Sequence, residues 1–169
     1  MVAPVQTREL KVTWEDPTAA RTQARDMSGR EWLEGVRDGT VPPPPAARLL
    51  DISVDEVEDG RVSLSMEPRE AQYNPAGTVH GGILTVLADT AMTTAVMSQL
   101  PAGAWAPTIE LKINFIRPVT QATGRISAVG SVIHMGGKVA VAESRILDAN
   151  GVLYAHSTAT CSIKRNPAP

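Results

Sequence analysis

The sequence predicts an α+β fold in which one long central helix is wrapped by a curved antiparallel β-sheet. Three observations carry this prediction. Residues 81–99 place apolar side chains three and four positions apart, which is typical of a helix. Residues 109–163 alternate apolar and polar side chains, which is typical of half-buried strands. Two short segments, 136–137 and 148–151, have the glycine and asparagine content of hairpin turns.

The N-terminal residues 1–45 are expected to form a helical and proline-rich extension outside this layered structure. We predict a helix over 18–36, with Ser28 as a candidate cap and Gly39 as its stop. The proline run 42–45 must then be extended, and we interpret it as a stiff spacer rather than a ligand for a proline-binding partner.

The main domain is expected to span residues 46–165. Period-two alternation begins at Leu49, and the first clear strand is Val62–Met66. The helix has a core-facing stripe made of Leu84, Leu87, Ala88, Ala91 and Ala95. Strands at 109–115, 125–134, 138–147 and 152–163 are expected to form a four-stranded antiparallel meander.

Composition excludes several classes of protein. The chain has 169 residues, 43% hydrophobic and 20% charged, which is enough apolar material for one core. A net charge of −2 provides no basic stripe for nucleic acid. Cys161 is the single cysteine, which excludes a disulfide scaffold and a cysteine-based zinc site. No signal peptide or membrane-spanning stretch is visible, so we expect a cytoplasmic protein that binds no membrane, no metal and no cofactor.

Asp89 is the single charged residue in the 39 residues from Ala71 to Ile109. It falls in the middle of the most apolar helix, where burying an unpaired carboxylate costs several kcal/mol. By helical spacing it shares a face, separate from the core stripe, with Gly82, Thr85, Val86, Thr93 and Val96. This face is available to a second subunit or a ligand. The alternative interpretation is an interfacial aspartate that is paired with an amide or a hydroxyl and has no catalytic role.

The segment before this helix offers hydrogen-bond donors. Gly81 and Gly82 at the helix start allow a ligand to approach the backbone closely, and the free N–H groups there stabilise an anion. Such donors suit the oxyanion that develops when a carbonyl is attacked. His80 and Asn74 add side-chain donors. The alternative is a turn and a helix cap with His80 bonded locally.

The spacing within the helix indicates how these groups can cooperate. His80 and Asp89 are nine residues apart, which is roughly 13 Å along a helix axis. One chain therefore cannot place both around the same carbonyl carbon. If they share a site, the helix start of one copy must face the helix middle of another, and a two-fold interface supplies two such sites.

The pattern N-x-x-G-T-x-H-G-G-x-x-x-x-x-x-D, from Asn74 to Asp89, resembles the hotdog-fold acyl-CoA thioesterases. It is similar in particular to the phenylacetate-degradation (PaaI-like) branch of the 4-hydroxybenzoyl-CoA thioesterase superfamily. The segment Thr108–Pro118 also resembles that family's strand after the central helix. The resemblance covers residues 46–165 and implies a hotdog fold, dimers or tetramers, and hydrolysis of an acyl- or aryl-CoA thioester to free acid and CoA.

The resemblance also implies roles for single residues. Asp89 matches the general base or nucleophile, and the backbone N–H of Gly81 matches the group that polarises the thioester carbonyl. Asn74 and His80 match residues that orient it. Thr108 matches a hydroxyl that helps hold the attacking water, where other members often have serine. The residues agree with this, because partial desolvation by an apolar face makes a carboxylate a better base near neutral pH.

The same resemblance places CoA along the subunit surface, with its phosphates near basic groups. The candidate substrate contacts are Gly82, Gly136, Gly137, Lys138 and Arg117. Two of them have simple alternatives: Lys138 as a solvated hairpin lysine and Arg117 as one member of a structural ion pair.

Other chemistries have less support. No G-x-S-x-G motif marks a serine nucleophile, and His80, His134 and His156 lack the paired spacing of metal ligands. The hydratase branch of the fold has D-x-x-x-x-H, but Thr94 stands five residues after Asp89. Two non-enzymatic alternatives remain: an acyl-CoA sensor or carrier on the same fold, and an interaction protein that docks a partner through its N-terminal extension.

Overall fold

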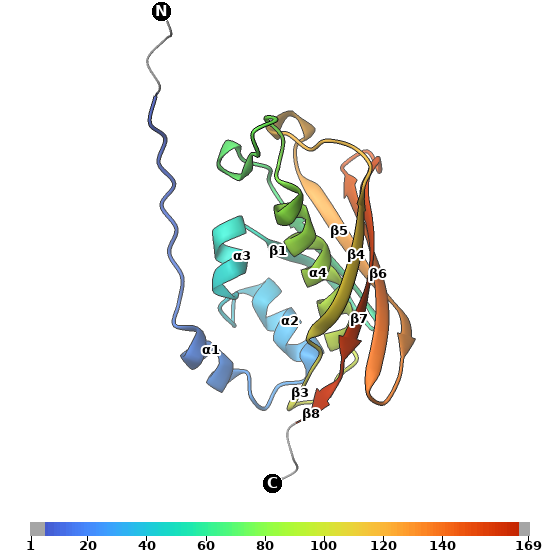
Figure 1. Cartoon of the computed structure of the whole chain (residues 1–169). Helices are drawn as coiled ribbons and strands as arrows, with labels where there is room; N and C mark the ends of the chain where they lie inside the picture. The colour runs from blue at the N-terminus through green and yellow to red at the C-terminus, as the bar shows by residue number, and fades with distance from the viewer. Residues whose placement is uncertain (1–5, 166–169) are drawn as a thin grey trace, which may run out of the picture.

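The computed structural model describes residues 6–165. In this range the helices are α1 (Pro17–Gln23), α2 (Gly29–Asp38), α3 (Pro45–Leu50) and α4 (Gly81–Met97), with short 3-10 helices η1 (Glu70–Gln72) and η2 (Gln121–Thr123). The strands are β1 (Ser53–Glu58), β2 (Arg61–Met66), β3 (Ala104–Trp105), β4 (Thr108–Phe115), β5 (Ile126–Met135), β6 (Val139–Asp148), β7 (Leu153–Ser162) and β8 (Lys164–Arg165). The α+β class is confirmed, with α4 lying along the curved sheet (Figure 1). None of the helices described in 6–165 is long and apolar enough to cross a bilayer.

Six strands form one antiparallel sheet in the order β1-β2-β5-β6-β7-β4, and β3 pairs with β8 separately. The predicted four-stranded meander is therefore wrong in one respect. Only β5, β6 and β7 follow one another, and β4 pairs with the far side of β7. The chain after β4 passes the start of α4, where Val79 N–H donates to the Val119 carbonyl (2.8 Å), and β5 then pairs with β2. Alternation determines which face a residue takes but not which strand lies beside it.

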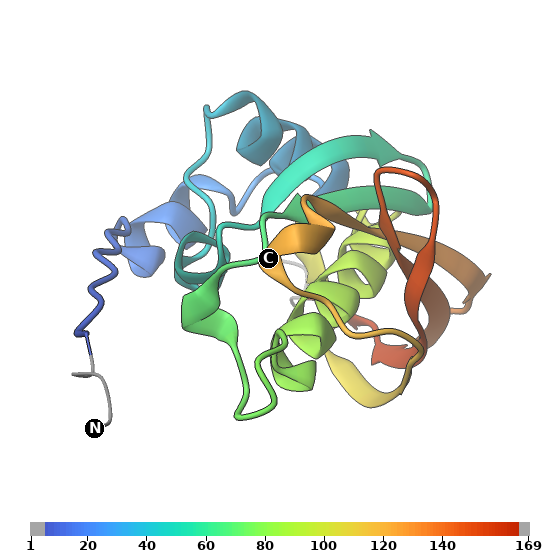
Figure 2. The ribbon, with the colours of Figure 1, turned by 90° about the horizontal axis from the view of Figure 1, so that it is seen from above.

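Helix α4 fills the concave side of the sheet (Figure 2). The predicted core stripe is confirmed, because each of its members is at most 3% exposed: Leu84, Leu87, Ala88, Ala91 and Ala95. Helix and sheet approach so closely at Gly130 that a Cβ there would lie 2.0 Å from the Ala91 carbonyl oxygen. The predicted face that carries Asp89 is wrong at one position. Val96 is fully buried, because it packs with Met92 and Ala140 in a second cluster of buried side chains.

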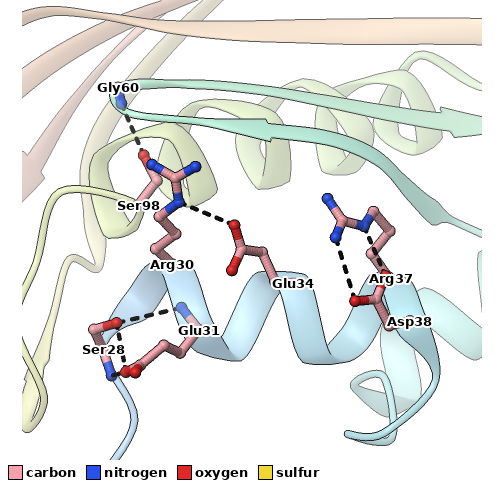
Figure 3. A network of polar contacts seen from close by, with 8 residues as sticks. All are labelled: Ser28, Arg30, Glu31, Glu34, Arg37, Asp38, Gly60 and Ser98. Atoms are coloured by element: carbon pink, nitrogen blue, oxygen red, sulfur yellow. Dashed lines mark hydrogen bonds and ion pairs between the residues drawn. The ribbon is translucent and has the colours of Figure 1, made fainter.

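The N-terminal extension contains two helices where one was predicted over 18–36. Ser28 is the N-cap of α2: its Oγ accepts from Glu31 N–H (3.3 Å), and the Glu31 carboxylate accepts from Ser28 N–H (2.7 Å) (Figure 3). Since a capping residue serves the free N–H groups of a new helix start, the predicted cap itself requires a break there. Gly39 ends α2 in the left-handed conformation (φ 77°), as predicted.

Two boundaries after α2 also differ from expectation. Pro45 begins α3, so the proline run is extended only through its first three members. Proline is favoured at a first helical turn, because the N–H that it lacks would have no partner there. Leu49 lies inside α3 rather than at the start of a strand, and β1 begins only at Ser53.

Helix α2 packs against the main body. Leu33 is fully buried in the core beneath the sheet. Gly29 N–H donates to the Leu100 carbonyl (3.1 Å), and a Cβ on Gly29 would lie 1.9 Å from the Met97 carbonyl oxygen. The solvent-facing side carries the ion pairs Arg30–Glu34 and Arg37–Asp38 (Figure 3). The proposed domain boundary at residue 45 stays a prediction.

Candidate active site

The start of helix α4 presents one open backbone donor. His80 is the N-cap: its Nδ1 accepts from Gly82 N–H (2.9 Å), and its carbonyl accepts from Ile83 N–H (2.9 Å) and Leu84 N–H (3.4 Å). Within residues 6–165, no acceptor is bonded to Gly81 N–H. Because Nδ1 is an acceptor, the neutral imidazole carries its proton on Nε2, and the exposed His80 ring is a second donor.

Asn74 organises the loop that leads into this helix start. Its Oδ1 accepts from Ala76 N–H (2.9 Å) and Thr78 N–H (3.3 Å), and its Nδ2 donates to Thr78 Oγ1 (3.1 Å). Gly77 completes the turn with a φ of 75°, a conformation that glycine adopts without strain. One of the two Asn74 amide hydrogens remains for a ligand.

A cavity of about 390 Å³ opens beside the helix start. Its lining consists of Asn74, Thr78, Val79, Gly81, Leu84, Phe115, Ile116, Arg117, Pro118 and Val119. Three predicted site residues therefore lie together here: Asn74, Gly81 and Arg117. Phe115 was not singled out by the sequence, although a Cβ on Gly81 would lie 3.0 Å from its ring. The alternation of apolar and polar residues predicts which face of the strand Phe115 takes, but not that it contacts the helix start.

The second group of site residues lies farther along the helix. Asp89 is half-buried on α4, and Thr108 Oγ1 at the start of β4 donates to Asp89 Oδ1 at 2.6 Å. A hydrogen bond to an ionised carboxylate is short and strong, so it fixes the orientation of Asp89. Cys161, opposite Thr108 on β7, is fully buried. Burial raises the pKa of the Cys161 thiol and the Asp89 charge raises it further, while a hydrogen bond with Thr108 lowers it in part. The predicted core position of Cys161 is confirmed by its burial.

These two groups do not meet within one chain. Gly81 and Asp89 are eight residues apart on α4, about 12 Å along the axis. Asp89 and Thr108 do not line the cavity beside Gly81. A carbonyl bonded to Gly81 N–H is therefore out of reach of the same chain's carboxylate.

The predicted substrate contacts also fall into two groups. Arg117 N–H donates to the Tyr154 carbonyl (3.2 Å), while the Lys138 carbonyl accepts from Ile163 N–H (2.8 Å). Tyr154 and Ile163 are nine residues apart along the extended segment that contains β7, or about 30 Å. Gly82 lies with Arg117 at the first end, and Gly136 and Gly137 lie with Lys138 at the second.

The ion-pair alternative for Arg117 finds no support. Its Nη1 donates to the Leu153 carbonyl at 2.5 Å. In the described part of the chain, no carboxylate is within ion-pair distance of Arg117. Lys138 is exposed in its hairpin, as the solvated interpretation also expects. His156 lies on the sheet with its Nε2 3.3 Å from Glu143 Oε2.

The chain is similar in sequence to known hydrolases. The model of the thioesterase superfamily matches residues 76–155. A protein of Halobacterium salinarum, provisionally named an esterase, is 38% identical over 104 residues, 59% of this chain and 67% of that protein. The 1,4-dihydroxy-2-naphthoyl-CoA hydrolase of Listeria monocytogenes is 26% identical over 116 residues, 69% of this chain and 93% of that enzyme.

Solved structures show the same fold. The thioesterase of Haemophilus influenzae superposes with a TM-score of 0.71 at 23% identity, over 80% of this chain and 92% of that one. The fold and the glycine-rich helix start therefore define a hotdog protein. The chain belongs to the thioesterase superfamily and is a thioester hydrolase, which confirms the resemblance drawn from Asn74–Asp89.

Proposed function

We propose that this protein hydrolyses an acyl- or aryl-CoA thioester to the free acid and CoA, at a site shared by two protomers. The observation that carries the proposal is the pair formed by Asp89 and Thr108, 2.6 Å apart on the accessible side of an apolar helix. The CoA hydrolase among the relatives supports CoA as the carrier. Neither of the non-enzymatic alternatives requires a carboxylate fixed in this way.

In the proposed reaction, Asp89 acts as general base. The Thr108 hydroxyl donates a hydrogen bond to Asp89, so the lone pairs of its oxygen are free to accept a hydrogen bond from a water molecule. Asp89 removes a proton from this water as the water oxygen bonds to the thioester carbon. The C–S bond then breaks, and the CoA thiolate leaves and takes up the proton. Direct attack by the carboxylate is the alternative route to the same products, through an anhydride that water hydrolyses.

The helix start of the second protomer polarises the carbonyl. Gly81 lines the cavity, and its unpaired N–H suits the oxyanion of the tetrahedral intermediate. The positive end of the α4 dipole adds to this stabilisation. His80 Nε2–H and the remaining Asn74 amide hydrogen complete the set of donors.

Strand β4 supports a two-fold dimer that joins the two halves. It is an edge strand of the six-stranded sheet, and unpaired strand edges invite pairing with another chain. It exposes apolar side chains, with Ile109 at 63% and Phe115 at 52%, and Val86 on α4 is 37% exposed. In an antiparallel β4–β4 pair, the Phe115 end of one strand meets the Thr108 end of the other. That arrangement brings Gly81 of one chain towards Asp89 of the partner subunit.

The same pairing brings the two groups of proposed CoA contacts together, one from each chain. It places Arg117 of one chain beside the Gly136–Lys138 hairpin of the partner subunit, so that both can contact phosphates of one CoA. The cavity beside Gly81 then receives the acyl group, since most of its lining is apolar. Assembly of such dimers into tetramers is compatible with this arrangement.

The test is Asp89→Asn, measured as thiol release from acetyl-, hexanoyl-, palmitoyl- and benzoyl-CoA. We expect turnover to fall by about a hundredfold or more, while calorimetric binding of CoA persists. Glu67→Gln is the matched control, because Glu67 is an exposed carboxylate on the surface. Parent activity in Asp89→Asn would contradict the role of Asp89, and no hydrolysis of any thioester by the parent would contradict the proposed function.

A further inference from the structure

Gln72 is a buried glutamine to which the proposed reaction gives no role, although it is bonded to the start of α4. It is 8% exposed and is the last residue of the short helix η1. Its carbonyl accepts from His80 N–H at 2.8 Å. His80 is the N-cap of α4, and its own carbonyl shares a planar peptide group with the Gly81 N–H. The main chain of Gln72 therefore helps to fix the donor proposed for the oxyanion.

The side chain of Gln72 reaches in the other direction, to the end of helix α3. Its Nε2 donates to the Leu50 carbonyl at 3.5 Å, and its Oε1 accepts from Arg69 N–H at 3.0 Å. Leu50 is the last residue of α3, where carbonyls have no partner within the helix. A buried amide needs such partners, because it has lost its hydrogen bonds to water. One side chain therefore joins η1 to the end of α3.

A second contact holds α3 to η1. Asp51, which follows α3, pairs with the Arg69 guanidinium. In the described residues 6–165, Asp51 is the one non-glycine residue with a positive φ (58°). Residues other than glycine seldom adopt this conformation, and it persists where the surrounding contacts enforce it. The chain after α3 is therefore held in the conformation that brings Asp51 to Arg69.

We infer that Gln72 is a positioning residue of the proposed reaction: it ties the start of α4 to α3 and so keeps the Gly81 N–H aimed at the thioester carbonyl. The inference rests on the proposed function and adds a residue that acts only through His80 and Gly81. Gln72 and α3 precede residues 76–155, which the thioesterase superfamily model matches. The support for the helix start is thus built from a part of the chain outside that match. Displacement of a catalytic group by about 1 Å is enough to slow a reaction strongly.

The experiment compares kcat and KM for hexanoyl-CoA in the parent, Gln72→Met and Gln72→Asn. Methionine has a similar length but no amide. Asparagine keeps the amide but is one methylene shorter, so it cannot reach Arg69 N–H and the Leu50 carbonyl together. We expect kcat to fall about tenfold with methionine and about threefold with asparagine, and KM to stay within about twofold, because an oxyanion donor acts in the transition state. Gln121→Met, at an exposed glutamine that begins η2, is the control and leaves kcat unchanged.

Mixed dimers separate a positioning role from a general loss of structure. Paired with Asp89→Asn, a Gln72→Met chain supplies its intact Asp89 to a site whose helix start is unaltered, so about half of the parent activity is expected. Paired with Gly81→Pro, which deletes the donor, the same chain must supply its own altered helix start, and about one-twentieth is expected. Equal activity of these two dimers would overturn the inference. A dimer of Gly81→Pro with Asp89→Asn, in which both chains keep Gln72, tests the shared site separately.

Hydrogen exchange measured by mass spectrometry gives a readout that needs no activity. We expect the amides of residues 79–84 to exchange about tenfold faster in Gln72→Met than in the parent, while those of β5 are unchanged. Parent values of kcat in both Gln72 variants would overturn the inference and leave the proposed function intact. If the parent hydrolyses no thioester, the proposed function fails and the exchange decides the inference. Faster exchange confined to the helix start supports the attachment through Gln72, and unchanged or uniformly faster exchange overturns it.

Discussion

The start and the middle of helix α4 carry different groups that the proposed hydrolysis needs, a hydrogen-bond donor and a base. At the start, Gly81 has an open N–H and a cavity beside it, but no carboxylate. In the middle, Asp89 has a carboxylate fixed by Thr108, but the backbone N–H groups there are used by the helix itself. The two sets are about 12 Å apart on one rigid element. A helix can therefore carry both halves of a site that only a second copy of the chain completes.

Removal of the donor at the helix start is expected to have the largest effect on activity. Gly81→Pro deletes the N–H, and we expect kcat to fall about a hundred- to a thousandfold, as for the loss of an oxyanion donor. The helix should still form, because proline suits a first helical position. His80, at φ −59° and ψ 134°, already has the conformation that a residue before proline prefers.

Gly81→Ala is the matched control for this variant. It adds the same Cβ near the Phe115 ring, 3.0 Å away, but keeps the N–H. The measurement is kcat for thiol release, together with circular dichroism to verify folding. If the alanine variant loses as much activity as the proline variant, crowding by the ring and not the lost donor explains the effect.

Mixed dimers test whether the helix start of one chain and the helix middle of the other form one site. Gly81→Pro and Asp89→Asn are each expected to be inactive, but a mixed dimer has one site in which both the donor and the base are intact. Random mixing makes half of the dimers mixed, each with one of two sites, so activity should return to about a quarter of the parent value. Co-expression with two affinity tags isolates the mixed species. No recovery in isolated mixed dimers would show that both groups act within one chain.

The sequence could predict the parts of this site that lie close together along the chain. Helical spacing predicts α4 to within two residues, and the same spacing shows that His80 and Asp89 cannot meet in one chain. The Ser28 cap and the Gly39 stop are also local features, set by side-chain and backbone chemistry within a few residues. Each of these predictions needs only periodicity or the chemistry of neighbouring residues.

The remaining features depend on which distant segments become neighbours. Period-two alternation is the same for β4 whether it pairs with β5 or with β7, so the position of β4 at the sheet edge was missed. The contact between Asp89 and Thr108 joins residues 19 positions apart, and only the family resemblance pointed to it. The pairing of β3 with β8 was missed for the same reason, because these two strands lie about sixty residues apart and meet only in the folded chain.

The smallest expected effect concerns the hydroxyl that fixes the carboxylate in the helix middle. Thr108→Ser keeps the donor at the same place, and we expect kcat within about threefold of the parent. Thr108→Val keeps the shape and removes the hydroxyl, and we expect kcat to fall about tenfold, the usual cost of one hydrogen bond to a charged group. KM should change little in either variant, because Thr108 holds the base and the water rather than CoA.

The measurement is kcat and KM for hexanoyl-CoA in all three proteins, with thermal unfolding as a check on packing. Thr108 is half-buried at the start of an edge strand, and valine is as well suited to a strand as threonine is. A loss seen with valine but not with serine therefore reports the hydroxyl. If valine keeps full activity, the 2.6 Å bond only holds Asp89 in the folded chain, and water activation belongs to Asp89 alone.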